Sequence, residues 1–184
     1  MKLFLTIVCC SLFFVAFSQN EDKLIDASAK GDLKKVMSLV GRGADVNYKN
    51  KARWTSLAYA SKYGFIDIVK YLVKNGADVN QTINTGESCL LVALKNKNIE
   101  IANFLIESKI NVNLKDLVGL SAISLAANDG DLATVKYLVE HGADVNSKNI
   151  SGRTALDIAT DNNIIKYLKS IGGKTGKELF AEAK

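Results

Sequence analysis

Residues 76–80 are Gly-Ala-Asp-Val-Asn, and the same five residues occur at 43–47 and at 142–146. The first two copies are 33 residues apart and the next lies 66 further on, so another copy is expected at 109. Residues 109–113, Lys-Ile-Asn-Val-Asn, keep the Val-Asn and replace the acid by Asn. Four copies in one register predict a chain made of structural repeats that stack on their neighbours.

A second periodic motif precedes each copy, and it begins with a hydroxyl residue at Thr55, Ser88, Ser121 and Thr154. Residues 55–60, Thr-Ser-Leu-Ala-Tyr-Ala, are typical of it. Together the two motifs resemble the ankyrin repeat, whose Thr-Pro-Leu-His-x-Ala opens its first helix and whose Gly-Ala-Asp-Val-Asn follows its second. The resemblance covers roughly residues 20–171. It implies an all-α ankyrin-repeat solenoid of helix-turn-helix repeats with β-hairpin fingers, capped at both ends.

The apolar pattern of one repeat independently predicts a helix before each Gly-Ala-Asp-Val-Asn copy. Ile68, Val69, Leu72 and Val73 form one stripe at helical spacing, and Gly76 can supply the left-handed residue that ends the helix. We also expect Asp32 and Asp131 to act as N-caps, and Asp67 and Glu100 to lie in first helical turns. Helices this short cannot bury their apolar stripes alone, so neighbouring repeats must pack together.

The register predicts how the chain is organised. The expected segments are a signal peptide at 1–18, an ankyrin-repeat domain at 19–171 and a polar tail at 172–184, with repeats at 20–47, 48–80, 81–113, 114–146 and 147–171. The first repeat lacks the hairpin and is expected to cap the N-terminal end. The last is three residues shorter and is expected to cap the C-terminal end, and the tail could add one helical turn against it.

Three departures from the family pattern bear on stability. Ser56, Cys89, Ala122 and Ala155 replace the proline of the motif, and Ala58, Leu91, Ser124 and Asp157 replace its histidine. Omitting a compatible proline costs roughly 0.4–1 kcal/mol per site, and the histidine bonds between repeats are lost, so we expect modest stability. Arg53 stands where the other hairpins have Gly86, Gly119 and Gly152, which predicts a finger that is bent differently or mildly strained.

The first 18 residues predict export. A positive start at Met1-Lys2, an apolar run over residues 3–17 and Ala16-Phe17-Ser18 are typical of a signal peptide cleaved after Ser18. An uncleaved anchor and a lipoprotein modified at Cys10 are alternatives, but the run is shorter than a membrane span needs and Cys9 precedes the lipidation position. We therefore expect a periplasmic or secreted protein with no membrane span after cleavage.

Charge and cysteine content limit the function classes. Cleavage would remove Lys2 from the 24 basic residues and none of the 19 acidic ones, which leaves 23 against 19, or a net charge of +4. That excess is too small to argue for nucleic acid or anionic lipid. Removing Cys9 and Cys10 leaves only Cys89, so no internal disulfide can form and packing alone must hold the fold.

The sequence offers little chemistry. Cys89 with His141 is the one candidate nucleophile and base, yet each occupies a slot of the repeat motif and no residue is evidently placed to orient the imidazole. One His and one Cys cannot form a typical zinc site. Residues 172–177, Gly-Gly-Lys-Thr-Gly-Lys, lack the first glycine of a phosphate-binding loop, because Leu168 stands there. We expect no enzymatic activity, no metal and no cofactor.

The remaining role is binding. Proteins that resemble this one bind other proteins through hairpin fingers and the concave helix face, so we expect a monomer with a protein partner and no nucleic acid. Lys51, Trp54, Lys62 and Tyr63 form the basic aromatic part of the predicted surface, and Glu87, Leu117, Val118, Leu120 and Arg153 form the rest. The apolar ones could instead fold back on their neighbours. Alternatives are an inhibitor or immunity-type protein for an envelope enzyme or toxin, and a binder of anionic surfaces through the second repeat.

Overall fold

The computed structural model describes residues 20–183, so the predicted signal peptide at 1–18 lies outside the described residues. The chain divides into an N-terminal unit that ends at Asp78 and a C-terminal unit that begins at Val79. Each unit is described by itself. Within residues 20–183, no helix is long and apolar enough to cross a membrane.

The N-terminal unit consists of two helix pairs. A helix over residues 20–30 precedes α2 (Leu33–Gly41), and α3 (Ser56–Tyr63) precedes α4 (Ile66–Lys74). The apolar stripe predicted for residues 68–73 packs inward: Val69 and Leu72 are buried, as is Val36 on α2. The short helices of this unit are therefore stabilised mainly by burial between the pairs.

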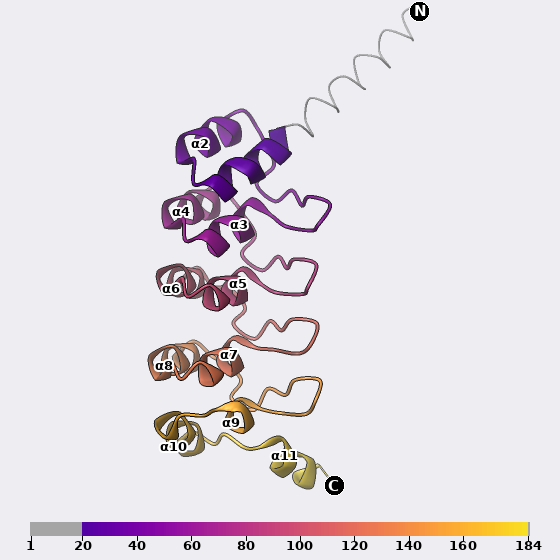
Figure 1. Cartoon of the computed structure of the whole chain (residues 1–184), viewed down its shortest axis with the longest axis vertical. Helices are drawn as coiled ribbons and strands as arrows, with labels where there is room; N and C mark the ends of the chain where they lie inside the picture. The colour runs from indigo at the N-terminus through magenta and orange to yellow at the C-terminus, as the bar shows by residue number, and fades with distance from the viewer. Residues whose placement is uncertain (1–19, 184) are drawn as a thin grey trace, which may run out of the picture. The chain divides into compact units, whose positions relative to one another are not determined.

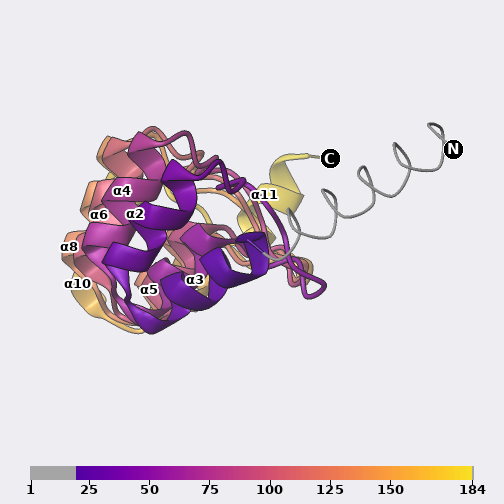
Figure 2. The same ribbon diagram turned by 90° about the horizontal axis from the view of Figure 1, so that it is seen from above.

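The C-terminal unit continues the same arrangement. Its helices are α5 (Cys89–Lys95), α6 (Ile99–Glu107), α7 (Ala122–Asn128), α8 (Leu132–Glu140), α9 (Ala155–Ile158), α10 (Asn162–Ser170) and α11 (Gly176–Glu182). Within this unit, Figure 1 shows three stacked helix pairs with hairpin loops that project from the same side. Figure 2 shows α6, α8 and α10 on one side of the stack and the loops on the other.

Every regular element in residues 20–183 is helical, which confirms the predicted all-α class. Paired extended backbone in this range is limited to isolated antiparallel bridges, Thr82 with Ser88 and Lys115 with Ser121. These bridges close two of the four hairpins, which we call fingers and define as residues 48–54, 81–87, 114–120 and 147–153.

The predicted helix ends are confirmed. Asp32 and Asp131 cap α2 and α8 by accepting hydrogen bonds from backbone N–H groups, and Thr55 caps α3 in the same way. Gly76 follows α4 with φ 87°. Lys109 stands at the equivalent glycine position and adopts φ 63°, so the turn keeps its left-handed residue even without glycine.

The Asn that ends each Gly-Ala-Asp-Val-Asn copy links consecutive repeats. The side chain of Asn47 donates to the carbonyl of Gly76 and accepts from the N–H of Asp78, at 3.0 and 2.8 Å. Asn113 makes the same two bonds, at 3.0 and 2.8 Å, to Gly142 and Asp144. Bonds between repeats therefore persist although the motif histidine is absent, a contribution that the expectation of modest stability did not include.

The shortened end of the chain has more structure than the sequence suggested. Instead of one helical turn, residues 176–182 form α11, with Thr175 and Glu178 in a capping box. The carboxylate of Asp157 accepts from the backbone N–H groups of Thr154 and Gly176, at 2.8 and 2.7 Å. The start of α11 is thereby attached to the start of α9.

Candidate binding surface

The fingers share one backbone arrangement. In each, the N–H of the residue at the turn entrance donates to a carbonyl four residues later, as Asn50 does to Trp54 at 3.0 Å. Side-chain oxygens of Asn50, Asp116 and Asn149 each accept two further backbone N–H groups of the same finger. The sequence reasoning missed this role, although an Asn or Asp at 33-residue spacing in three fingers was a visible signal.

Arg53 does not distort its finger, contrary to the prediction. Its φ is 60°, close to the 79° of Gly86, and its N–H donates to the carbonyl of Asn50 at 2.8 Å, as the glycines do in their fingers. A left-handed arginine is less favourable than glycine there, but the surrounding hydrogen bonds impose the same turn. The finger of residues 48–54 therefore presents its side chains on the same backbone as the others.

Within the C-terminal unit, the finger tips are hydrogen-bonded in series. The N–H of Leu117 donates to Thr85 at 3.0 Å, and the N–H of Ile150 donates to Val118 at 3.2 Å. A Cβ added at Gly119 would lie 2.8 Å from Cα of Asn149, so the adjacent tips approach as closely as the backbone allows. The tips form one continuous row.

An exposed apolar edge runs along this row. The side chains of Leu117, Val118 and Ile150 are 73%, 55% and 75% exposed. The structure therefore places Leu117 and Val118 at the surface, as predicted, and adds Ile150, which the site prediction did not include. Leu120 differs from its prediction, because it is only half-buried rather than exposed, at the base of the finger before α7.

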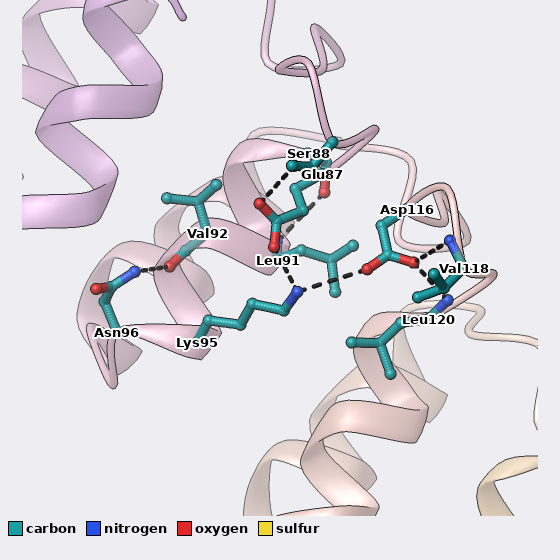
Figure 3. A network of polar contacts seen from close by, with 10 residues as sticks. Glu87, Ser88, Leu91, Val92, Lys95, Asn96, Asp116, Val118 and Leu120 are labelled. Atoms are coloured by element: carbon teal, nitrogen blue, oxygen red, sulfur yellow. Dashed lines mark hydrogen bonds and ion pairs between the residues drawn. The ribbon is translucent and has the colours of Figure 1, made fainter.

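Glu87 is half-buried and has a partner within the chain, whereas it was predicted as a contact residue (Figure 3). Its carboxylate pairs with the ammonium of Lys95 on α5, and that ammonium lies 3.5 Å from the carboxylate of Asp116. Burial lowers the pKa of Lys95, but the two carboxylates outweigh this and raise it. This network holds the finger of residues 114–120 to α5, so Glu87 and Lys95 position the apolar edge.

Arg153 is exposed at the end of the last finger. One guanidinium nitrogen donates to the carbonyl of Asp157 at 2.7 Å. Its side chain is thus fixed along the start of α9, with most of the guanidinium facing solvent.

The predicted aromatic residues meet in the N-terminal unit. The ring centroids of Trp54 and Tyr59 are 4.7 Å apart, and those of Tyr59 and Tyr63 are 6.2 Å apart. The ammonium of Lys62 lies 5.3 Å from the ring centroids of both Trp54 and Tyr63. We call Trp54, Tyr59, Lys62 and Tyr63 the aromatic–lysine cluster. Tyr59 was missed, although its spacing of four residues from Tyr63 on a predicted helix placed the two on one face.

The predicted residues thus form two separate sets. Lys51, Trp54, Lys62 and Tyr63 belong to the N-terminal unit, whereas Glu87, Leu117, Val118, Leu120 and Arg153 belong to the C-terminal unit. Lys51 is exposed beside the aromatic–lysine cluster in sequence, at the tip of the finger of residues 48–54.

The candidate nucleophile and base occupy structural positions. Cys89 is the first residue of α5 and is 1% exposed, whereas His141 is the exposed C-cap of α8. The Nδ1 of His141 lies 2.8 Å from the carbonyl of Tyr137, and the two rings are 4.3 Å apart. Over residues 20–183, no cluster of His, Cys, Asp and Glu has the arrangement of a metal site.

Comparison with known proteins agrees with the geometry. A family model described as ankyrin repeats (3 copies) matches residues 24–116 and 111–177. A search of curated proteins found no match. Ankyrin repeats generally serve as non-enzymatic modules for protein interaction, so the match implies protein partners. With helix pairs, fingers and motif all in one register, this chain belongs to the ankyrin-repeat family.

Proposed function

We propose that this protein is an exported, non-enzymatic binding module that recognises a protein partner through its fingers and the exposed face of the helices that follow them. Export is inferred from residues 1–18, whose sequence has the features of a signal peptide. The partner would then be met in the cell envelope or the secreted space. Inhibition of an envelope enzyme, or neutralisation of a toxin, would be a particular form of this binding.

The apolar edge of the C-terminal unit carries the proposal. Leu117, Val118 and Ile150 are held at the surface by a row of backbone bonds, and Asp116 and Lys95 fix the finger on which two of them stand. Exposed, contiguous apolar side chains cost solubility and are typical of interaction sites. Because the backbone beneath them is already ordered, binding would require little loss of conformational entropy.

The first experiment is affinity capture from the envelope and secreted fractions with the mature protein, followed by binding measurements with the purified partner. The test variant carries Leu117→Asp and Val118→Asp. A matched control carries Met37→Asp and Phe180→Asp, two exposed apolar residues on α2 and α11, outside the fingers.

We expect the control to bind the partner like the wild type and the test variant to lose at least about tenfold in affinity, or about 1.4 kcal/mol. The helical circular dichroism of both variants should remain unchanged. Equal binding by all three proteins would contradict a role for the apolar edge.

A further inference from the structure

We propose that the aromatic–lysine cluster of the N-terminal unit binds an acidic polypeptide segment that also carries apolar side chains. This inference rests on the proposed function, because it assigns a partner chemistry to one part of the predicted binding surface. It concerns Trp54, Tyr59, Lys62 and Tyr63, together with the exposed cations of the finger of residues 48–54.

The cluster is a preformed surface. Thr55 caps α3 through a bond of 3.1 Å from the N–H of Ala58, and α3 then places Tyr59, Lys62 and Tyr63 at a spacing that shares one helical face. Asn50 fixes Trp54 from the other side, because its side-chain oxygen accepts the Trp54 N–H at 3.0 Å. The rings therefore form a row whose order is set by the backbone on both sides.

Charge gives the polarity of the ligand. Residues 48–63 contain Lys49, Lys51, Arg53 and Lys62 and no Asp or Glu. Lys51 and Arg53 are exposed and form no ion pair within residues 20–183. Lys62 is held against the rings, which keeps its ammonium within the aromatic surface. A ligand that fits must offer anionic groups next to groups that pack on aromatic faces.

A polypeptide fits this combination better than a nucleic acid does. Nucleic-acid affinity depends on many phosphate contacts along a basic track, and the finger of residues 81–87, the next in the repeat, has no Lys or Arg and contains Glu87. An acidic peptide needs only a few carboxylates near Lys51 and Arg53, with its apolar side chains on Trp54 and the tyrosines. The ankyrin-repeat family also binds proteins.

Trp54 makes the inference directly testable, because it is the only tryptophan in the chain. Its fluorescence in the mature protein would be titrated with three probes. They are a short peptide in which Asp and Glu alternate with Leu, the same peptide with Asn and Gln in place of the acids, and an oligothymidylate of equal charge. The acidic peptide should give a saturable change of Trp54 emission that weakens with added salt, and the amide peptide should bind at least about tenfold more weakly.

Two charge variants provide the control. Lys51→Glu with Arg53→Glu should reduce affinity for the acidic peptide at least about tenfold, whereas Lys34→Glu with Lys35→Glu, the same charge change on α2, should leave it within about twofold. Circular dichroism would confirm that both variants fold. The inference is overturned by no saturable response up to about 1 mM peptide, by equal affinity for the amide peptide, by equal losses in both variants, or by tighter binding of the oligothymidylate.

The outcome is separable from that of the proposed function. The Leu117→Asp and Val118→Asp variant should bind the acidic peptide like the wild type, because both substitutions lie in the C-terminal unit. If the acidic peptide fails while the captured partner still depends on Leu117 and Val118, the inference is wrong and the proposed function stands.

Discussion

The fingers of residues 48–54 and 114–120 have the same internal hydrogen bonds but opposite surfaces. Asn50 and Asp116 each accept two backbone N–H groups, and each finger has one residue with positive φ, Arg53 or Gly119. The first finger carries cations before an aromatic residue, and the other exposes Leu117 and Val118. The comparison teaches that backbone bonds fix the finger, while the tip residues are available for binding chemistry.

The largest expected effect separates the helix core from both fingers. Leu138 is fully buried on α8, so Leu138→Ala should lower the free energy of unfolding by about 2–5 kcal/mol through lost burial and a cavity. Leu117→Ala, the same substitution at an exposed tip, should change it by less than about 0.5 kcal/mol. Urea denaturation would measure both. Comparable losses would mean that the tip contributes to the core.

The next effect concerns the left-handed residue of the finger. Gly119→Ala should destabilise by about 1–3 kcal/mol, because φ is 76° and the new Cβ would lie 2.9 Å from the backbone nitrogen of Ile150. Gly152→Ala is the control: its φ is 74°, but no atom lies within 4 Å of the new Cβ. Thermal melts of the two variants should differ, and equal melts would remove the close approach of the tips as a cause.

A smaller effect should follow from the side chain that organises the turn. Asp116→Ala removes the acceptor for the N–H groups of Val118 and Leu120 and one partner of Lys95, which should cost about 1 kcal/mol. Asp116→Asn keeps the acceptor, as Asn50 does in its finger, and should cost less. Hydrogen exchange of the Val118 and Leu120 amides gives a local readout. The same loss in both variants would assign the effect to the ion pair with Lys95.

The last finger differs from the others because α11 follows it, and this contact should depend on pH. Burial raises the pKa of Asp157, but hydrogen bonds from Thr154 and Gly176 outweigh it and lower the pKa below its usual value. The stabilisation is therefore present at neutral pH and is lost as the pH falls below about 4. Amide exchange in α11 should accelerate there, while Asp157→Asn should show no such step from this residue.

The smallest expected effect tests the one finger with a non-glycine turn residue. Arg53→Gly should change stability by less than about 1 kcal/mol, because relief of the left-handed conformation is offset by the greater flexibility of glycine when unfolded. It should also weaken binding of the acidic peptide by removing a cation. Chemical denaturation and Trp54 fluorescence measure the two effects, and a loss of several kcal/mol would indicate an unrecognised structural role for the guanidinium.

Much of the fold could be predicted because its signals are local and recur. The apolar stripe of residues 68–73, the caps at Asp32 and Asp131 and the glycine at 76 each depend on a few neighbouring residues. Predictions that depended on the repeat pattern alone were less accurate. Arg53 was expected to alter its finger because the pattern has glycine there, and the backbone bonds kept the turn unchanged.

The candidate surface was only partly predictable for a related reason. Leu117 and Val118 were placed correctly, because their slots face solvent in any repeat of this register. Glu87 and Leu120 were not, because their exposure depends on Lys95 and on the packing at the base of the finger. The helical spacing of Tyr59 and Tyr63 was visible, but their meeting with Trp54 requires the bend between finger and helix.

The sequence by itself determined the repeat, its register, the all-α class and the family, because these follow from motifs that recur every 33 residues. Only the tertiary structure decided which residues lie together: the series of bonds between finger tips, the carboxylates around Lys95 and the lysine between two aromatic rings. The physical reason is range. Helix stripes and caps act within a few residues, whereas these contacts join residues that the folded backbone must first bring together.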